Sequence, residues 1–298
     1  MKKNVVVTGA SGFVGTHLIP MLIENGYSVT AIIKYSKDRG KLPENVKSVI
    51  ADLAKKGKWQ NSLKGNDFII HLAAQISAKD PKEFTRNNVK ATNNLMVAAK
   101  LAKIKKIILY SSAAVSSIRR DPYSKTKDEQ EKIIKKSKIQ SIIIRPSMIY
   151  GPGDTKNIGW LIKLVKKLPL IPLPGGGVFG RQPIFVNDIC KITIKLLDKD
   201  YGKNIFEIHG KEYITLRKMI STIQKNLRSK KLVVDVPIAL LTSTVTISEK
   251  FLPNPKFTAD QINSLISGEK FKGDDWASIF DIIPTRFEAG VAKMIKSK

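Results

Sequence analysis

A tyrosine and a lysine that could together move a proton stand four residues apart in the segment DPYSKTK at positions 121–127. Proline is favoured in the first turn of a helix, so Pro122 predicts that a helix begins here. The spacing then places the side chains of Tyr123 and Lys127 on one face of that helix. A phenol with a pKa near ~10 is a weak base at neutral pH, but an adjacent ammonium group favours the phenolate. Tyr123 could therefore exchange a proton with a hydroxyl or carbonyl group of a substrate.

A glycine turn near the start of the chain could hold phosphate groups. The apolar run VVV at positions 5–7 predicts a buried strand, and three glycines follow it before a helical pattern of apolar residues. In this strand-turn-helix order, glycines let the backbone approach a pyrophosphate at a helix N-terminus. The sequence thus predicts that NAD or NADP binds at Gly9, Ser11, Gly12, Phe13, Val14 and Gly15. The positive charge of an oxidised nicotinamide would also favour the phenolate of Tyr123.

The choice between NAD and NADP is normally made where the second strand ends, by an acidic residue for NAD or a basic one for NADP. Here the strand ends in Lys34, with Lys37 and Arg39 close behind and Asp38 as the first acid. This pattern favours NADP. The alternative is that Lys34 is one more surface lysine in a lysine-rich chain.

Apolar strand patterns alternate with helical patterns through the first half of the chain. The strands have little polar alternation, which is typical of parallel strands buried on both faces, and are predicted at Asn4–Thr8, Ser28–Ile33, Lys47–Ala51, Asp67–Leu72, Lys106–Ser111 and Gln140–Arg145. Helices are predicted at Gly12–Asn25, with a kink or change of register at Pro20, and at Lys82–Leu101, Tyr123–Lys136, Thr155–Lys167 and Asn187–Leu197. The fold class is therefore α/β, a Rossmann-type doubly wound parallel sheet.

Glycine and proline interrupt the regular pattern at YGPG (150–153) and at PLPGGG (172–177). We therefore expect two domains, a nucleotide-binding domain at 1–150 and a smaller substrate-binding domain at 151–298, some of whose elements return to the first sheet. The apolar stretch Val236–Ile247 is too short to span a bilayer.

The composition excludes several classes of protein. The single cysteine, Cys190, and three scattered histidines argue against a disulfide framework and a metal site. The 298 residues carry 52 Lys and Arg against 25 Asp and Glu, a net charge of +27, but the basic residues are spread over nearly every element with few interleaved aromatics. This favours a solvated lysine-rich surface over a specific nucleic-acid site, with weak, salt-sensitive anion binding as the alternative. No export signal is apparent, so we expect a cytoplasmic protein.

With these motifs in place, the chain resembles the NAD-dependent epimerase/dehydratase family, in the extended branch of the short-chain dehydrogenases/reductases. The resemblance is carried by the TGxxGxxG-like turn at 8–15, the YxxxK motif at 123–127, NVKAT at 88–92, RPSMIYGPG at 145–153 and RQPIFVND at 181–188. It extends over nearly the whole chain. The RPSMIYGPG form and the LPLPGGG loop are similar to bacterial polysaccharide-pathway members that act on UDP-linked sugars.

The resemblance implies roles for further residues. Ser112, three residues before Val115, would bind the reacting oxygen, Lys127 would hold the cofactor ribose, and Arg181 would meet the pyrophosphate of a nucleotide-diphosphate sugar. Further cofactor contacts would come from Asp52, Leu53, Leu72, Ala73, Ala74 and Pro146. His71 would lie beside the cofactor, either with a chemical role or as a buried structural histidine. The helices that carry Asn88 and Tyr123 would form a homodimer interface.

The leading hypothesis is an NAD(P)-dependent enzyme acting at C4 of a nucleotide sugar, either a 4-epimerase or a 4-ketoreductase of cell-envelope sugar biosynthesis. One alternative is a sterol-type or flavonoid-type dehydrogenase of the same branch, with Val236–Ile247 as an apolar substrate wall. Another is a non-catalytic nucleotide-binding subunit or assembly factor, since the tail at Phe257–Ala292 resembles the corresponding part of such relatives.

Overall fold

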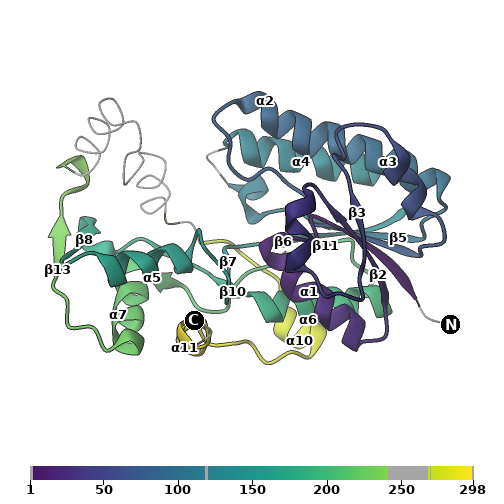
Figure 1. Ribbon diagram of the computed structural model, residues 1–298. Coiled ribbons are helices and arrows are strands. Elements are labelled where there is room, and N and C mark those ends of the chain that lie inside the picture. The colour runs from purple at the N-terminus through teal and green to yellow at the C-terminus, as the bar shows by residue number, and fades with distance from the viewer. Residues whose placement is uncertain (1–2, 118–119, 241–267, 269, 297–298) are drawn as a thin grey trace. The chain divides into compact units, whose positions relative to one another are not determined.

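The computed structural model describes residues 3–117, 120–240, 268 and 270–296 (Figure 1). The chain divides into two compact units. The first unit comprises Met1–Pro146, Val186–Ile208 and Gly273–Ile283, and the second comprises Ser147–Phe185, His209–Lys272 and Pro284–Lys298. Each unit is described by itself.

The first unit is built on a seven-stranded sheet in which every neighbouring pair of strands is parallel. The order across the sheet is β11 (Ile205–Ile208), β6 (Gln140–Pro146), β5 (Lys106–Tyr110), β4 (Phe68–His71), β1 (Asn4–Thr8), β2 (Ser28–Ile33) and β3 (Lys47–Ile50). Strands β2 and β3 lie on one side of β1, and the strands from β4 onward lie on the other, so the order of the strands reverses at β1. This is the doubly wound topology predicted from the sequence, and it places a ligand crevice at the carboxyl ends of the strands.

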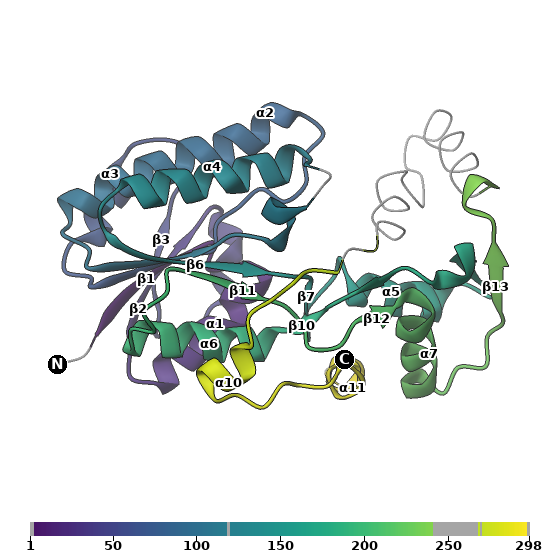
Figure 2. The same ribbon diagram turned by 180° about the vertical axis from the view of Figure 1, so that it is seen from behind.

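Helices cover both faces of this sheet, as Figures 1 and 2 show. One face carries α2 (Pro81–Phe84), α3 (Ala91–Leu101) and α4 (Pro122–Lys136), and the other carries α1 (Phe13–Glu24), α6 (Val186–Asp198) and α10 (Trp276–Phe280). Short 3₁₀ turns complete the connections at η1 (Ser36–Lys41), η2 (Lys58–Leu63) and η4 (Ala113–Ser116). A core of buried apolar side chains from the strands, η2 and α3 fills one side of the sheet, and includes Val6, Ile69, Leu95 and Ile107.

Among the residues that the structure describes, the second unit has short strands and three longer helices. These helices are α5 (Ile158–Lys167), α7 (Leu216–Leu227) and α11 (Phe287–Lys296). Its strands pair two by two, β7 (Ile149–Tyr150) with β10 (Ile184–Phe185), β9 (Gly180–Arg181) with β12 (Ile214–Thr215), and β8 (Ile171–Pro174) with β13 (Val233–Val236). The 3₁₀ turn η5 (Gly175–Gly177) follows β8. The buried rings of Tyr150, Phe185 and Phe287 lie at the centre of its core.

One predicted helix differs from the structure. The long helix expected at Lys82–Leu101 is interrupted, because a π-helical turn, η3 (Thr85–Lys90), separates the four-residue α2 from α3. The first helix, α1, contains Pro20 and runs from Phe13 to Glu24. The stretches Val236–Ile247 and Phe257–Ala292 lie partly outside the described residues, which contain no helix long and apolar enough to cross a membrane.

Candidate active site

The glycine turn after β1 packs closely against the segment that follows β4. Gly9 has a φ of +66°, and a Cβ there would lie 2.7 Å from the backbone nitrogen of Ala73. A Cβ on Gly15 would lie 2.3 Å from the carbonyl oxygen of Ala10. Gly12 turns back so that its amide donates to the Gly9 carbonyl at 2.9 Å. Side chains are therefore excluded at Gly9 and Gly15 for reasons of space, and Leu72 and Ala73 lie against the turn.

The N-terminus of α1 is open to an anion. Gly12 caps it without a side chain, and its first turn, which begins with Phe13 and Val14, holds no acidic residue. Unpaired backbone amides and the positive end of the helix dipole attract phosphate groups at such a terminus. The cradle therefore fits the pyrophosphate of a dinucleotide, with Ser11 in the turn beside it.

The residues expected to contact the adenosine part lie at the ends of β2 and β3. Lys34 is exposed, with its ammonium 5.5 Å from the ring centre of Tyr35. The carboxylate of Asp52 accepts hydrogen bonds from the Arg86 guanidinium and from the amide of Ala54. Burial acts to raise the pKa of Asp52, but the bonds from Arg86 and Ala54 outweigh it and leave the pKa lowered.

The contacts of two basic residues near the ends of β2 and β3 were not predicted from the sequence. Arg86 was not predicted, because its partner lies 34 positions away along the chain. Arg39, expected beside Lys34, instead donates to the backbone carbonyls of Pro43, Glu44 and Val46. Arg39 therefore closes its own loop, while Lys34 remains at the strand end.

Ser112 and Tyr123 lie close enough for the Ser112 hydroxyl to act on the Tyr123 phenol. Ser112 caps η4, where its hydroxyl accepts from the amide of Ala114 at 3.2 Å. Burial raises the pKa of Tyr123 to about 12, the Ser112 hydroxyl opposes this, and the Asp121 carboxylate adds to the rise. Without cofactor, Tyr123 is thus a phenol at neutral pH, whereas the sequence led us to expect the nearby ammonium to favour the phenolate.

Helix α4 positions Tyr123 and Lys127 as the spacing predicts. Asp121 caps this helix by accepting from the amide of Ser124 at 2.7 Å. Lys127 is 1% exposed, and its ammonium donates to the Tyr110 carbonyl and to Oε1 of Gln130, each at 2.6 Å. Burial lowers the pKa of Lys127 to about 7, with Glu131 acting in the opposite direction.

His71, at the end of β4, is buried and hydrogen-bonded through both ring nitrogens. Its Nδ1 lies 2.6 Å from the hydroxyl of Thr8 and its Nε2 lies 2.9 Å from that of Thr92. Burial, together with the positive charge of Lys127, lowers the pKa of His71 to about 3. This favours the structural role of the two roles considered for His71.

The π-helical turn η3 places Asn88 between Gln75, in the segment after β4, and Thr126 on α4. The side-chain nitrogen of Asn88 donates to the Thr126 hydroxyl at 3.0 Å and to the Gln75 carbonyl, while its side-chain oxygen accepts from the Gln75 amide at 2.6 Å. A π-helical turn often marks a functional position. Asn88 ties the chain after β4 to α4.

The preference for Ser112 over Ser111 has a structural basis. The Ser111 hydroxyl donates to the buried Glu131 carboxylate at 2.6 Å, and this carboxylate also pairs with Arg145 at 2.7 Å. Arg145 in turn pairs with Glu207 at 2.8 Å. Ser111 therefore belongs to a buried ion-pair network, and Ser112 is the hydroxyl that meets Tyr123.

The remaining predicted residues lie as follows. Leu53 is buried, Leu72, Ala73 and Ala74 are partly buried after β4, and the buried Pro146 ends β6. Arg181 is partly buried in the second unit, on β9 opposite Ile214. No cluster of three or more His, Cys, Asp or Glu side chains that could hold a metal occurs among the described residues.

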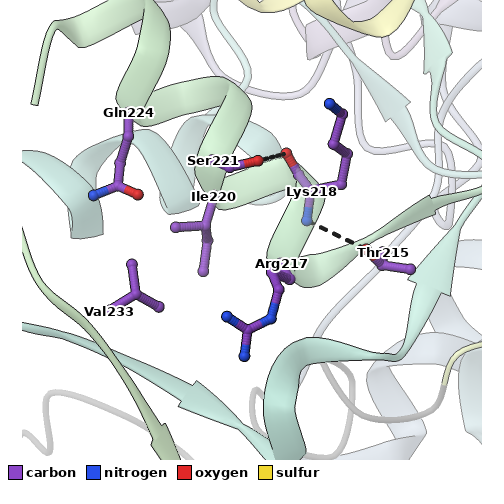
Figure 3. Close-up of a pocket in the computed structure, with 7 residues that line it drawn as sticks. All are labelled: Thr215, Arg217, Lys218, Ile220, Ser221, Gln224 and Val233. Atoms are coloured by element: carbon purple, nitrogen blue, oxygen red, sulfur yellow. Dashed lines mark hydrogen bonds between the residues drawn. The ribbon is translucent and has the colours of Figure 1, made fainter.

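The second unit also has a surface cavity of about 470 Å³, shown in Figure 3. It lies beside α7 and β13 and is lined by Thr215, Arg217, Lys218, Ile220, Ser221, Gln224 and Val233. None of these residues was predicted to bind cofactor or substrate.

Comparisons with known proteins agree with this arrangement. A family model described as "NAD dependent epimerase/dehydratase family" matches residues 5–208. UDP-glucose 4-epimerase of Vibrio cholerae is 27% identical over 269 residues, which is 80% of each chain. The human decarboxylating sterol-4-alpha-carboxylate 3-dehydrogenase is 27% identical over 248 residues, covering 74% of this chain and 66% of its relative.

The fold is shared with solved structures. That of UDP-glucuronic acid 4-epimerase from Bacillus cereus in complex with NAD has a TM-score of 0.74 at 21% identity, over 99% of this chain and 96% of the other. The parallel sheet, the glycine turn and the family model lead to one conclusion: the chain belongs to the NAD-dependent epimerase/dehydratase family.

Proposed function

We propose that this protein is an NAD(P)-dependent enzyme acting at C4 of a UDP-sugar, as a 4-epimerase or a 4-ketoreductase. The observation that carries the proposal is the proximity of the Ser112 hydroxyl to the Tyr123 phenol, with Lys127 one helical turn further on. The parallel strands β1, β4 and β5 bring the glycine turn and Ser112 to the same edge of the sheet. The similarity to UDP-glucose 4-epimerase supports a UDP-sugar as substrate.

In the proposed reaction, a bound nicotinamide cofactor supplies the acceptor or donor of a hydride at C4. Tyr123 takes the proton from the C4 hydroxyl during oxidation and returns it to the carbonyl oxygen during reduction. Ser112 donates a hydrogen bond to that oxygen. Because burial keeps Tyr123 protonated in the free protein, we expect the positive charge of an oxidised nicotinamide to be needed for proton removal. Arg181 is the proposed partner of the sugar pyrophosphate.

Two measurements test the proposal. Mass spectrometry of the purified protein would detect retained NAD, which we expect of an epimerase that recycles its cofactor. Protein that is purified empty and binds NADPH would indicate a reductase, in accord with Lys34 at the end of β2. Exchanging Lys34 for aspartate should then weaken NADPH binding more than NADH binding, whereas equal weakening would remove the proposed preference for NADP.

The similarity to the sterol dehydrogenase favours a second candidate, an enzyme that oxidises or reduces a hydrophobic alcohol. Calorimetry with UDP separates the two candidates. Binding of UDP supports the nucleotide sugar, and no binding at millimolar UDP would leave the sterol-type reaction as the better proposal.

We further propose a homodimer formed through α3 and α4, on the basis of the family resemblance. Sedimentation equilibrium with the wild type and with Val97→Glu tests this, since Val97 on α3 is an exposed apolar residue. A dimer that Val97→Glu dissociates supports the proposal, and a monomeric wild type refutes it.

A further inference from the structure

Gln130 is fully buried and lies one helical turn beyond Lys127 on α4. Its Oε1 accepts from the Lys127 ammonium at 2.6 Å, and its Nε2 lies 2.6 Å from the hydroxyl oxygen of Thr92. A lysine ammonium has only donors, so the amide oxygen of Gln130 must be the end that faces it. Thr92 gives its own proton to the Asn88 carbonyl at 2.6 Å, so its oxygen is left to accept from Gln130. The orientation of the Gln130 amide is thus fixed from both ends.

This contact continues towards the glycine turn. The Thr92 hydroxyl also meets Nε2 of His71, and Nδ1 of His71 meets Thr8, the residue before Gly9. All of these side chains are buried, with at most 1% of Lys127 exposed. A continuous set of hydrogen bonds therefore joins Lys127 to the strand that carries the cofactor turn.

The groups that face Lys127 leave its charge poorly neutralised. On its own helix, Tyr123 lies one turn before Lys127, and the carboxylate of Glu131, one turn after it, is paired with Arg145. From β4 it is His71, which is neutral. The ammonium is therefore held directly by two uncharged oxygens, the Tyr110 carbonyl and Oε1 of Gln130.

An ammonium group has three N–H donors, of which Tyr110 and Gln130 take two. One N–H remains, and its direction is fixed by the other two bonds. A neutral amine has only two N–H donors, so the same two acceptors would then leave none for a ligand.

We propose that Gln130 is a positioning residue, which holds the Lys127 ammonium so that its third N–H is presented to the cofactor ribose. This inference rests on the proposed function only in assigning a nicotinamide cofactor to the glycine turn. Gln130 touches neither cofactor nor substrate in this role and acts through Lys127.

The test is the affinity of the purified protein for NADH and NADPH, measured by fluorescence between pH 6 and 9 without any sugar. In the wild type, affinity should fall as the pH rises through about 7, because Lys127 then loses the N–H that binds ribose. Gln130→Glu keeps the acceptor and adds a negative charge, so it should move this fall at least one pH unit higher. Gln130→Met removes the acceptor and should weaken binding about tenfold at pH 6.5.

Thr193→Val is the matched control, because it removes another buried hydrogen bond of the same unit, the one between the hydroxyls of Thr193 and Tyr110 at 2.6 Å. It should lower the unfolding temperature without moving the pH dependence of binding. A wild-type pH dependence in Gln130→Glu would overturn the proposal, and so would unchanged affinity in Gln130→Met.

Failure of the proposed function gives a different result. A wild type that binds NADH or NADPH but not UDP refutes the sugar reaction and leaves the role of Gln130 testable on the same curves. A wild type that binds neither cofactor overturns both proposals. If Gln130→Met does not fold, Gln130→Glu still decides the matter through the direction of its pH shift.

Discussion

The polar side chains of the candidate site in the first unit and those of the surface cavity in the second unit lie in opposite surroundings. In the first unit, Lys127, His71 and Glu131 are at most 1% exposed, and each has hydrogen-bond partners at defined positions. At the surface cavity of the second unit, the lining residue Arg217 is 52% exposed and pairs with Asp235, which is 61% exposed.

The buried groups are the ones whose pKa values are shifted, whereas the exposed ion pairs can change their partners. Burial moves the pKa of Lys127 down to about 7 and that of Tyr123 up to about 12, which brings proton transfer under the control of small changes in charge. Exposed ion pairs are screened by salt and contribute little to stability, so their partners can change. The comparison predicts that substitutions in the buried network of the first unit have large effects and that those at the cavity of the second unit have small ones.

The largest effect is expected for Tyr123→Phe. Loss of the phenol removes the proposed proton donor and acceptor, so turnover of a UDP-sugar should fall by about 100-fold to 10,000-fold. Affinity for NADH should stay within about threefold, because the glycine turn is unchanged. Steady-state kinetics and a fluorescence titration measure the two quantities. An unchanged biological activity in Tyr123→Phe would instead favour a non-catalytic nucleotide-binding subunit.

The next largest effect is expected for Glu131→Gln, on stability. Glu131 is 1% exposed and receives bonds from Ser111 and Arg145, so the substitution leaves Arg145 with Glu207 as its remaining charged partner. Breaking a buried ion pair typically costs about 3–5 kcal/mol in the free energy of unfolding. Urea unfolding measures this loss, and a change below about 1 kcal/mol would contradict the view that the network holds the first unit together.

The sequence predicts the first unit well where the signal is local. The run VVV at positions 5–7 is buried in β1 because an apolar segment without alternation suits a strand covered on both faces. Gly9 and Gly15 belong to one short motif, at positions 9–15, whose spacing is set by the backbone of the turn itself. Tyr123 and Lys127 share a helix face because four residues make about one turn.

The buried network could not be predicted, because its members are distant in sequence. Thr8, His71, Thr92 and Gln130 come from four different elements, and only the parallel register of β1 with β4 and the packing of α3 and α4 bring them together. No local pattern marks Gln130 as different from the other polar residues of a lysine-rich helix. The π-helical turn at Thr85–Lys90 was missed for a similar reason, since Asn88 is held there by bonds to Gln75 and Thr126 rather than by helix propensity.

The second unit was predicted less well. Its strands are two to four residues long, which is too short for a period-2 pattern to be detected. Arg181 was found only through the family resemblance. The strand pairing that places it opposite Ile214 left no signal in the sequence.

A matched pair of glycine substitutions, one in each unit, tests the comparison with effects that we expect to be of intermediate size. In Gly15→Ala, the new Cβ would lie 2.3 Å from the Ala10 carbonyl oxygen, so the cofactor turn must shift. In Gly290→Ala, it would lie 2.3 Å from the hydroxyl of Tyr150, which packs against Phe287. Each substitution should cost about 1–3 kcal/mol in the free energy of unfolding.

The two glycine variants should differ in cofactor binding. Gly15→Ala should weaken NADH or NADPH binding by more than tenfold, and Gly290→Ala should leave it unchanged. Thermal unfolding and fluorescence titration measure the two effects. Gly40→Ala is the control, since a Cβ there meets nothing within 4 Å. Normal cofactor affinity in Gly15→Ala would mean that this turn does not hold the pyrophosphate.

The smallest effect is expected for Arg217→Ala at the surface cavity. Its guanidinium donates to the Gly176 carbonyl at 2.9 Å and pairs with Asp235 at 2.5 Å, in each case close to water. An exposed ion pair of this kind contributes less than about 1 kcal/mol, and salt reduces it further. Urea unfolding at low and high ionic strength should therefore give nearly equal stabilities for Arg217→Ala and the wild type, converging as salt increases. A loss above about 2 kcal/mol that persists in high salt would show that Arg217 organises the loop at Gly176 as firmly as Glu131 organises the first unit, and the contrast between the two units would then fail.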